Sequence, residues 1–321
     1  MTLEFNYRGS LTNSTSPPGN FSGSWNSTSL PSVFTTNSSE TFWQGFWYYQ
    51  RITPAVVDAG GTLYSYIRPE ANNGLNFSVI IKLPLKSYRE AVEFVAPLYK
   101  DLNRIGINVV AQPATNPDTI TTVPKYGIVQ APRNNLFGSR LIPRANWDNE
   151  TIYNRTFAAI RAAVELGLVY HGVDHYAPPS VAGYPGNMTS ISPVWRSAIV
   201  HADIMDTGWT GLSTNSAQAF WTRHERLAKA MDHIRAATPG SGAYFNEADV
   251  LEPNWQETFF GPHYPRLLRT KRARDPWGLF WAPTTPGSEA WRVITEGDVP
   301  TQNGPLCQTG FEDPWTVEEE R

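Results

Sequence analysis

Cysteine is almost missing from this 321-residue chain, in which it occurs only as Cys307. One cysteine excludes an intramolecular disulfide framework and a zinc site made of several thiolates. Long apolar runs are missing too, since no stretch approaches the roughly 20 residues that cross a bilayer. The chain also has no Gly-x-Gly-x-x-Gly after a predicted strand and no phosphate-binding loop. It therefore carries no nucleotide-binding fingerprint of its own.

Positive charge is not in excess either. The net charge is −3 and the sequence pI is about 6.1, which argues against nucleic acid or an anionic membrane as a partner. Apolar and aromatic residues are abundant, at 40% and 13% of the chain, with 12 Trp. This composition suits a packed sheet or a pocket that stacks planar ligands. The length allows one large domain or two ordinary ones.

Glycosylation motifs give the main indication of a compartment. Asn-x-Ser/Thr sequences without a central proline begin at Asn13, Asn20, Asn26, Asn37, Asn76, Asn149, Asn154 and Asn187. Chance in an Asn-, Ser- and Thr-rich chain is the alternative, but the number favours the secretory pathway. Residues 1–5 are not followed by the apolar stretch of a signal peptide. We therefore expect a secreted glycoprotein, with this sequence an internal piece of a longer precursor.

Apolar residues spaced by three and four predict the main helices. Ser87 and Glu90 form a capping box that opens one of them, and Gly106 ends it. Strands are predicted from two-residue alternation, which places Tyr64 and Tyr66 on the same face of one strand. The predicted helices cover about residues 42–56, 87–105, 150–166 and 213–237, and the predicted strands cover residues 62–68, 75–83, 107–111, 168–176 and 194–205.

Two segments are predicted to be irregular. Residues 8–40 are rich in Asn, Ser, Thr, Pro and Gly, so residues 1–40 are assigned to a surface loop or extension. Residues 112–148 are rich in proline and too long for a simple connection. Between these segments, hairpin-like strand pairs separated by helices predict an α+β fold, with an antiparallel sheet covered by helices on one face.

The strongest signal is a run of motifs near the C-terminus. Residues 242–291 contain Tyr-Phe-Asn-Glu-Ala-Asp, then Phe-Gly-Pro-His-Tyr, Asp-Pro-x-Gly-Leu-Phe and Gly-Ser-Glu-x-Trp. Upstream lie Phe-Gly-Ser-Arg-Leu-Ile-Pro at residues 137–143 and Pro-Val-Trp-Arg at residues 193–196. In this order the motifs resemble the berberine bridge enzyme-like FAD-linked oxidases of the vanillyl-alcohol oxidase superfamily, in particular the fungal branch with the isoamyl alcohol oxidases. The resemblance covers roughly residues 40 to 310.

The resemblance implies a two-domain flavoenzyme in which an antiparallel sheet domain roofs the substrate side of FAD. Residues 41–240 would be the substrate-binding α+β domain, and residues 241–321 a C-terminal, helical berberine-like segment that returns to the flavin domain. The N-terminal FAD-binding domain of the family is not in this sequence, so FAD is expected to be held mainly outside this chain. The domain would be a separate chain, a part that is cleaved off, or a part left out of this sequence by truncation of the gene model.

The resemblance also assigns roles to residues. It makes Tyr244 the catalytic base and places Asn246 where it can hold the tyrosine or the flavin edge. Alternation in a strand at 242–249 would put both on one face, with Phe245, Glu247 and Asp249 on the other. Since free tyrosine has a pKa near 10, a base role requires help from the surroundings or a concerted transfer. A buried tyrosine satisfied by the asparagine is the alternative.

Tyr64, Tyr66 and His201 are further candidates for substrate binding, although core aromatics and a structural His201–Asp203 pair are the alternatives. His171 and His175 are too far apart on a strand to share a metal, and no metal site is predicted. A basic run is interpreted as a solvated helix face, and it comprises Arg266, Arg269, Lys271, Arg272 and Arg274.

Two functions follow as alternatives. The first is the substrate-binding and C-terminal portion of an FAD-dependent oxidase, which transfers hydride from an alcohol-type or secondary-metabolite substrate to flavin N5 and then passes electrons to O2. The second is a flavin-free binding or cyclase-type protein that kept the pocket. An oxidase portion should expose an apolar patch where a flavin domain docks, whereas a self-sufficient module should not.

Overall fold

A computed structural model describes residues 1–11, 34–36, 38–109, 112–113, 135–183, 189–207, 216–295, 299–300 and 304–309. Its main feature is an eight-stranded sheet in the order β2-β1-β4-β3-β7-β8-β6, with β5 also paired to β1. All pairs are antiparallel except β1–β2. The strands are β1 (Thr2–Ser10), β2 (Phe34–Thr35), β3 (Thr62–Glu70), β4 (Gly74–Lys82), β5 (Gln112–Pro113), β6 (Leu136–Pro143), β7 (Val169–Asp174) and β8 (Ala198–Asp206).

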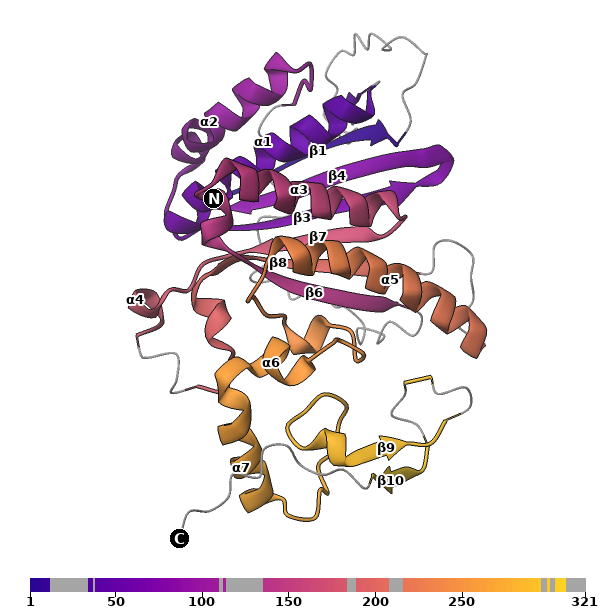
Figure 1. Ribbon diagram of the computed structural model, residues 1–321. Coiled ribbons are helices and arrows are strands. Elements are labelled where there is room, and N and C mark those ends of the chain that lie inside the picture. The colour runs from indigo at the N-terminus through magenta and orange to yellow at the C-terminus, as the bar shows by residue number, and fades with distance from the viewer. Residues whose placement is uncertain are drawn as a thin grey trace.

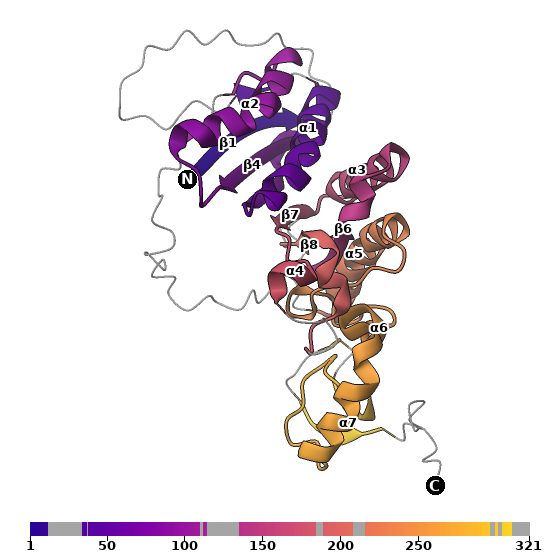
Figure 2. The ribbon, with the colours of Figure 1, turned by 90° about the vertical axis from the view of Figure 1, so that its left-hand side faces the viewer.

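The four long helices lie on one face of this sheet (Figures 1 and 2). They are α1 (Ser39–Asp58), α2 (Tyr88–Arg104), α3 (Glu150–Glu165) and α5 (Ala217–Ala237). Each begins at a side-chain cap, supplied by Ser38, Ser87, Asn149 and Ser216, because these oxygens accept the otherwise unpaired N–H groups of the first turn. Under them the core is strongly aromatic, with Phe46 packed against Phe77 of β4 and Tyr170 of β7.

The α+β fold predicted from the sequence is therefore confirmed, as are the predicted helices and the strands near residues 62–68, 75–83 and 168–176. Other assignments were wrong. Residues 136–143, predicted as irregular, form β6, and residues 2–10 of the supposed extension form β1. Residues 107–109 are not in a strand. Residues 193–196 form the 3-10 helix η4 (Pro193–Arg196), so that the last predicted strand begins only at Ala198.

The sheet face opposite the long helices carries polar and aromatic side chains, and we call it the outer face. Tyr64, Tyr66 and His171 are half-buried there, whereas Leu63 and Ile67, on the helix-covered face, are fully buried. This separation follows from the two-residue period of strands.

The C-terminal segment extends below the sheet (Figure 1) and has a small buried cluster of its own, made of Ala243, Phe259, Phe260, Tyr264 and Leu268. Its elements are α6 (Trp255–Phe260), α7 (Tyr264–Arg274), and the paired strands β9 (Trp291–Val293) and β10 (Leu306–Gln308), while the short α4 (Pro179–Ala182) lies between β7 and β8 in the chain. Within the described parts of the chain, no helix is both long and apolar enough to cross a membrane.

A carboxyl group is sealed between α1 and the sheet. Asp174, at the end of β7, is fully buried and accepts hydrogen bonds from Thr53 (3.0 Å) and Tyr49 (3.3 Å) of α1. Burial raises the pKa of Asp174 to about 7, and the two hydrogen bonds only partly counteract it. In the unfolded chain an aspartate has a pKa of about 3.9. Between this value and about 7, Asp174 therefore carries a proton in the folded state but not in the unfolded state.

We expect the free energy of unfolding to fall as pH rises from 4 to 8, because the folded state binds more protons than the unfolded state between the two pKa values. Asp174→Asn should remove this slope and be more stable than the wild type at pH 8, by on the order of 2 kcal/mol. Urea unfolding at several pH values measures this. Asp148→Asn, at an exposed position, is the control, and equal slopes in all three proteins would contradict the assignment.

Candidate active site

A cross-strand row on the outer face positions the candidate site. Strand register places Tyr66, His171, Asp203 and Ser139 side by side on β3, β7, β8 and β6. Neighbouring strands are roughly 4.8 Å apart, so side chains in such a row touch. The Tyr66 and His171 rings are stacked, with centroids 4.1 Å apart and an interplanar angle of 6°. Arg68 lies over the other side of the Tyr66 ring, at 3.7 Å from its centroid.

Asp203 lies at the centre of the row between two imidazoles. Its Oδ2 is 3.1 Å from His171 Nδ1, and its Oδ1 is 2.8 Å from His201 Nε2. Burial would raise the pKa of Asp203, but the hydrogen bonds from His171 and His201 outweigh it and hold the pKa below the usual range. Since an ionised carboxylate only accepts hydrogen bonds, His171 donates its Nδ1 proton to Asp203 Oδ2.

Ser139 connects this row to the C-terminal segment. Its Oγ lies 2.9 Å from His201 Nε2 and accepts the backbone N–H of Tyr244 at 3.0 Å. Ser139 has no exposed surface, so its hydroxyl is unavailable as a nucleophile and serves to hold His201 and Tyr244 in place. This contact links residues 105 positions apart.

The segment after Tyr244 is not the strand that the sequence analysis predicted. Tyr244 precedes the 3-10 helix η5 (Phe245–Glu247), in which residues three apart lie on one side. The assignment of Glu247 to the face opposite Tyr244 was therefore wrong, because both contact His201. The Tyr244 ring meets the imidazole edge-to-face at 5.3 Å, and Glu247 Oε2 is 3.7 Å from His201 Nδ1.

The predicted Tyr244–Asn246 pair is in contact even so. Asn246 Nδ2 donates a hydrogen bond of 2.7 Å to the Tyr244 hydroxyl. The Tyr244 ring also packs edge-on against Trp195 of η4, at 5.5 Å. An amide donor aimed at the phenol oxygen stabilises negative charge on that oxygen, which is the state that a proton acceptor needs.

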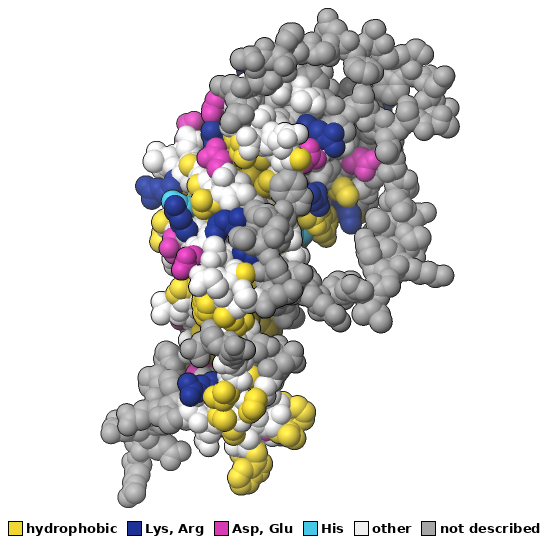
Figure 3. Space-filling model, turned by 90° about the vertical axis from the view of Figure 1, so that its right-hand side faces the viewer, with side chains coloured by type: hydrophobic (Ala, Val, Ile, Leu, Met, Phe, Trp, Pro, Cys, Tyr) yellow, Lys and Arg dark blue, Asp and Glu magenta, His cyan; other side chains and the backbone are white. Residues whose placement is uncertain are grey.

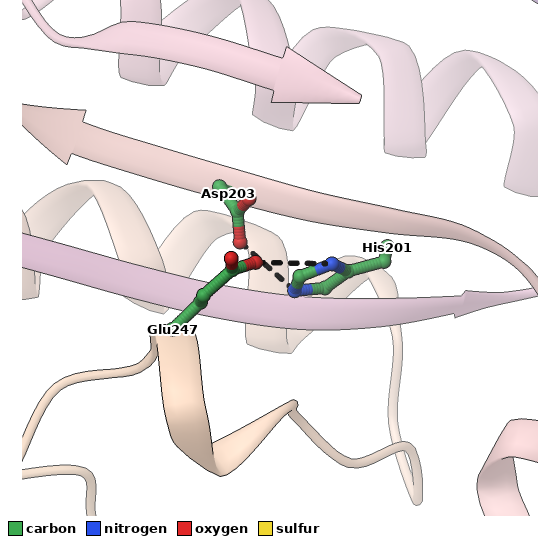
Figure 4. A group of neighbouring side chains, drawn as sticks. All are labelled: His201, Asp203 and Glu247. Carbon is green, nitrogen blue, oxygen red and sulfur yellow. Dashed lines mark ion pairs between the residues drawn. The ribbon is translucent and has the colours of Figure 1, made fainter. Parts of the chain in front are cut away.

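Glu247 differs from its neighbours in exposure. Its side chain is 48% exposed, whereas those of His201 and Asp203 are 3% and 2% exposed. Burial and, next, the charge of Asp203 raise the pKa of Glu247. Figure 4 shows the carboxyl groups of Asp203 and Glu247, which come from β8 and from η5, close together on one side of the His201 ring.

These three residues also form the one set among the described residues whose donor atoms lie close enough, within 4.8 Å, to hold a metal ion. One imidazole and two carboxylates suit zinc in principle. However, His201 Nε2 already faces Ser139 and Asp203, and only Nδ1 points toward Glu247. The absence of a metal site stays a prediction.

The other predicted residues lie at different distances from this centre. Tyr66 is in the row, Tyr64 is two residues along β3 beside Lys82, and His201 lies buried beneath the rings of Tyr244 and Trp195. His171 and His175 are not brought together, since His175 stacks on Trp195 instead. The roles of Tyr64, Tyr66 and His201 in substrate binding stay predictions.

Sequence reasoning missed the contributions of Ser139, Trp195 and Glu247. Ser139 and Trp195 belong to the upstream motifs at 137–143 and 193–196, so the motifs were the available signal. Of the glycosylation candidates, Asn76, Asn149 and Asn154 lie at the surface or partly exposed, while Asn13, Asn20, Asn26, Asn37 and Asn187 lie outside the described residues. The basic run forms α7 as expected, although Lys271 also contacts Asp275 and the Phe280 carbonyl.

Comparison with known proteins finds the Berberine and berberine like family at residues 243–285. The chain is 30% identical over 276 residues to the FAD-linked oxidoreductase ZEB1 of Gibberella zeae, covering 82% of this chain and 45% of ZEB1. It is 29% identical over 264 residues to the FAD-linked oxidoreductase patO of Aspergillus clavatus (81% and 44%). The match to the VAO-type flavoprotein oxidase VAO615 of Thermothelomyces thermophilus is 30% over 269 residues (81% and 44%).

Solved structures show the same fold. The VAO-type flavoprotein MtVAO615 from Myceliophthora thermophila C1 superimposes with a TM-score of 0.65 at 23% identity, covering 96% of this chain and 49% of that protein. A variant of berberine bridge enzyme gives 0.55 at 10% identity, covering 89% and 54%. The chain thus spans about half the length of the proteins it matches, and the matched part is their C-terminal portion.

Ser139→Ala should reduce the free energy of unfolding by about 1–3 kcal/mol, because it leaves the part-buried Tyr244 N–H without its acceptor and removes the contact with His201. Ser197→Ala is the matched control, since Ser197 is exposed and bonds only the nearby Val194 carbonyl. Urea unfolding of the three proteins measures the difference. Equal losses in the two variants would show that Ser139 does not hold the site together.

Proposed function

This chain belongs to the berberine bridge enzyme-like, VAO-type family of FAD-linked oxidoreductases, and we propose that it forms the substrate-binding wall of an alcohol-oxidising active site. The flavin would be held by a portion corresponding to the rest of the relatives' length. The observation that carries this proposal is the hydrogen-bonded Tyr244–Asn246 pair at the outer face, packed against Trp195 and His201.

The outer face has the side chains expected of a pocket wall that faces the substrate side of a bound flavin. It presents half-buried aromatic rings at Tyr64 and Tyr244, which suit planar ligands. His171 Nε2 is buried without a hydrogen-bond partner among the described residues, so a polar atom is ready for a bound group. The described loops supply no glycine-rich phosphate cradle, which agrees with a chain that lines the pocket while the flavin's phosphates are held elsewhere.

FAD, when bound, supplies the acceptor for a hydride from the substrate carbon and passes the electrons on to oxygen. The chain's own residues bind and orient the substrate and remove the proton from its hydroxyl group. Tyr244 Oη accepts the proton of the substrate hydroxyl, and the Asn246 amide stabilises the negative charge on that oxygen. Trp195 and His201 fix the direction of the Tyr244 ring. The Tyr66 ring is held rigidly between His171 and Arg68, which leaves the edge of the ring for contact with the substrate.

A cluster of exposed apolar side chains favours this proposal over a self-sufficient binding module. Trp277, Leu279 and Phe280 of the Asp-Pro-x-Gly-Leu-Phe motif are 87%, 79% and 76% exposed. Figure 3 shows hydrophobic side chains projecting from the lower end of the molecule, where the C-terminal segment lies. Next to them is a hollow of about 490 Å³ lined by residues that include Leu267, Lys271 and Trp281. Such surface is typical of an interface.

Asp275 holds this cluster in shape. Its carboxylate accepts the backbone N–H groups of Leu279 and Phe280, at 2.9 Å each, and pairs with Lys271. These hydrogen bonds from the Lys271 side chain and from the backbone lower the pKa of Asp275. The apolar residues are therefore presented by an ordered turn, as a docking surface requires.

The test is co-expression of this chain with the N-terminal portion of VAO615, the part that it does not match. We expect a complex with visible flavin absorbance that aliphatic or benzylic alcohols bleach in the absence of oxygen. Tyr244→Phe should slow this reduction by about 10²-fold or more, the typical contribution of a positioned base. Tyr88→Phe, exposed on α2, is the control. Bound flavin that no alcohol reduces, or full-speed reduction by Tyr244→Phe, would refute the proposal.

Trp277→Ser together with Phe280→Ser should weaken association with the flavin-binding portion. Each substitution removes most of the apolar surface that the side chain would bury in the interface. The double variant should fold normally, since both residues are exposed in the chain alone. Analytical ultracentrifugation of the mixed portions measures the association. Leu85→Ser, an equally exposed apolar position at 89% far from the C-terminal segment, is the control. Unchanged association in the double variant would mean that the cluster is not the docking surface.

A further inference from the structure

The 3-10 turn after Tyr244 brings a second ionisable group to the site. Tyr244 and Glu247 are three residues apart and lie against the same imidazole, that of His201. Glu247 takes part in none of the steps proposed above for the reaction. Yet Glu247 is the member of the cluster that joins the buried interior to the surface, since its side chain is half exposed while His201 and Asp203 are buried.

We infer that Glu247 is the proton exit of the site: it receives, by way of His201, the proton that Tyr244 takes from the substrate, and releases it to solvent. This inference rests on the proposed function. Oxidation of a CH–OH group to C=O moves one hydride, with its electron pair, from carbon to the flavin and one proton from oxygen to Tyr244. Each turnover therefore leaves a proton on Tyr244 that must leave before the next substrate reacts.

The geometry of His201 supports this route. Its Nε2 is committed to Asp203 and Ser139, so Nδ1 is the ring atom that can exchange a proton. Nδ1 faces Glu247 Oε2 at 3.7 Å, a gap that a small rotation of the half-exposed Glu247 side chain closes to hydrogen-bond distance. A proton on Nδ1 thus has a carboxyl group beside it that reaches water.

The charges around Glu247 tune it for this role. Asp203 on β8 is ionised and repels a second negative charge, whereas His201 on the same strand and His171 on β7 favour it. Burial and the Asp203 charge prevail, so the pKa of Glu247 lies above that of an ordinary glutamate. Such a carboxyl takes up a proton more readily than a fully solvated one.

The first experiment uses the flavin-loaded complex in steady-state turnover. Glu247→Gln should lower the rate about tenfold, less than the loss of the base itself, and added formate or acetate should restore it. Tyr244→Phe should not respond to these acids. In the wild type the rate should fall as pH drops through the raised pKa of Glu247, because a protonated Glu247 cannot accept. Glu257→Gln, exposed on α6, is the matched control.

The second experiment needs no flavin. The carboxyl carbon of Glu247 is followed by NMR in the chain alone as pH is varied. Its midpoint should lie above the usual glutamate range, and Asp203→Asn should lower it. The inference would be overturned if the wild type turns over and Glu247→Gln is equally fast, or if formate and acetate do not restore the rate that Glu247→Gln loses. A titration midpoint of Glu247 within the usual glutamate range would also overturn it. A wild-type complex that never reduces its flavin would instead refute the proposed function.

Discussion

The two-residue alternation of the antiparallel strands is the constraint on which the rest of the structure depends. It directs Leu63, Ile67 and their neighbours into the aromatic core under the helices and leaves Tyr66 and His171 on the outer face. Because a slip of one residue would exchange the two faces, the register that buries the core also fixes the cross-strand row. The site is therefore specified by packing on the opposite side of the sheet.

Local signals predicted most of the fold. The Ser87–Glu90 capping box, the helix stripe from Phe42 and the β3–β4 hairpin are each complete within a short window of sequence. Strand β6 was missed for a physical reason, since residues 138–142 are buried on both faces and show no alternation. Strand β1 did alternate, at Leu3, Phe5 and Tyr7, but was merged with the polar segment that follows it.

The site could be predicted only in part, because its decisive contacts join distant segments. The spacing of Tyr244 and Asn246 gave the right pair, yet a strand and a 3-10 turn both bring residues two apart into reach of each other. The hydroxyl of Ser139 selects between them by accepting the Tyr244 N–H from 105 residues away. Nothing near Tyr244 in the sequence shows this contact, and the position of Glu247 follows from it.

Two carboxyl groups show why a raised pKa does not by itself mark a functional residue. Burial raises the pKa of both Asp174 and Glu247. Asp174 is sealed beneath α1 with no exposed surface, so its proton changes stability and can take part in no reaction. Glu247 stands at the mouth of a charged cluster that is costly to bury. Accessibility, together with contact to His201 beside Tyr244, is what makes Glu247, and not Asp174, a candidate for proton transfer.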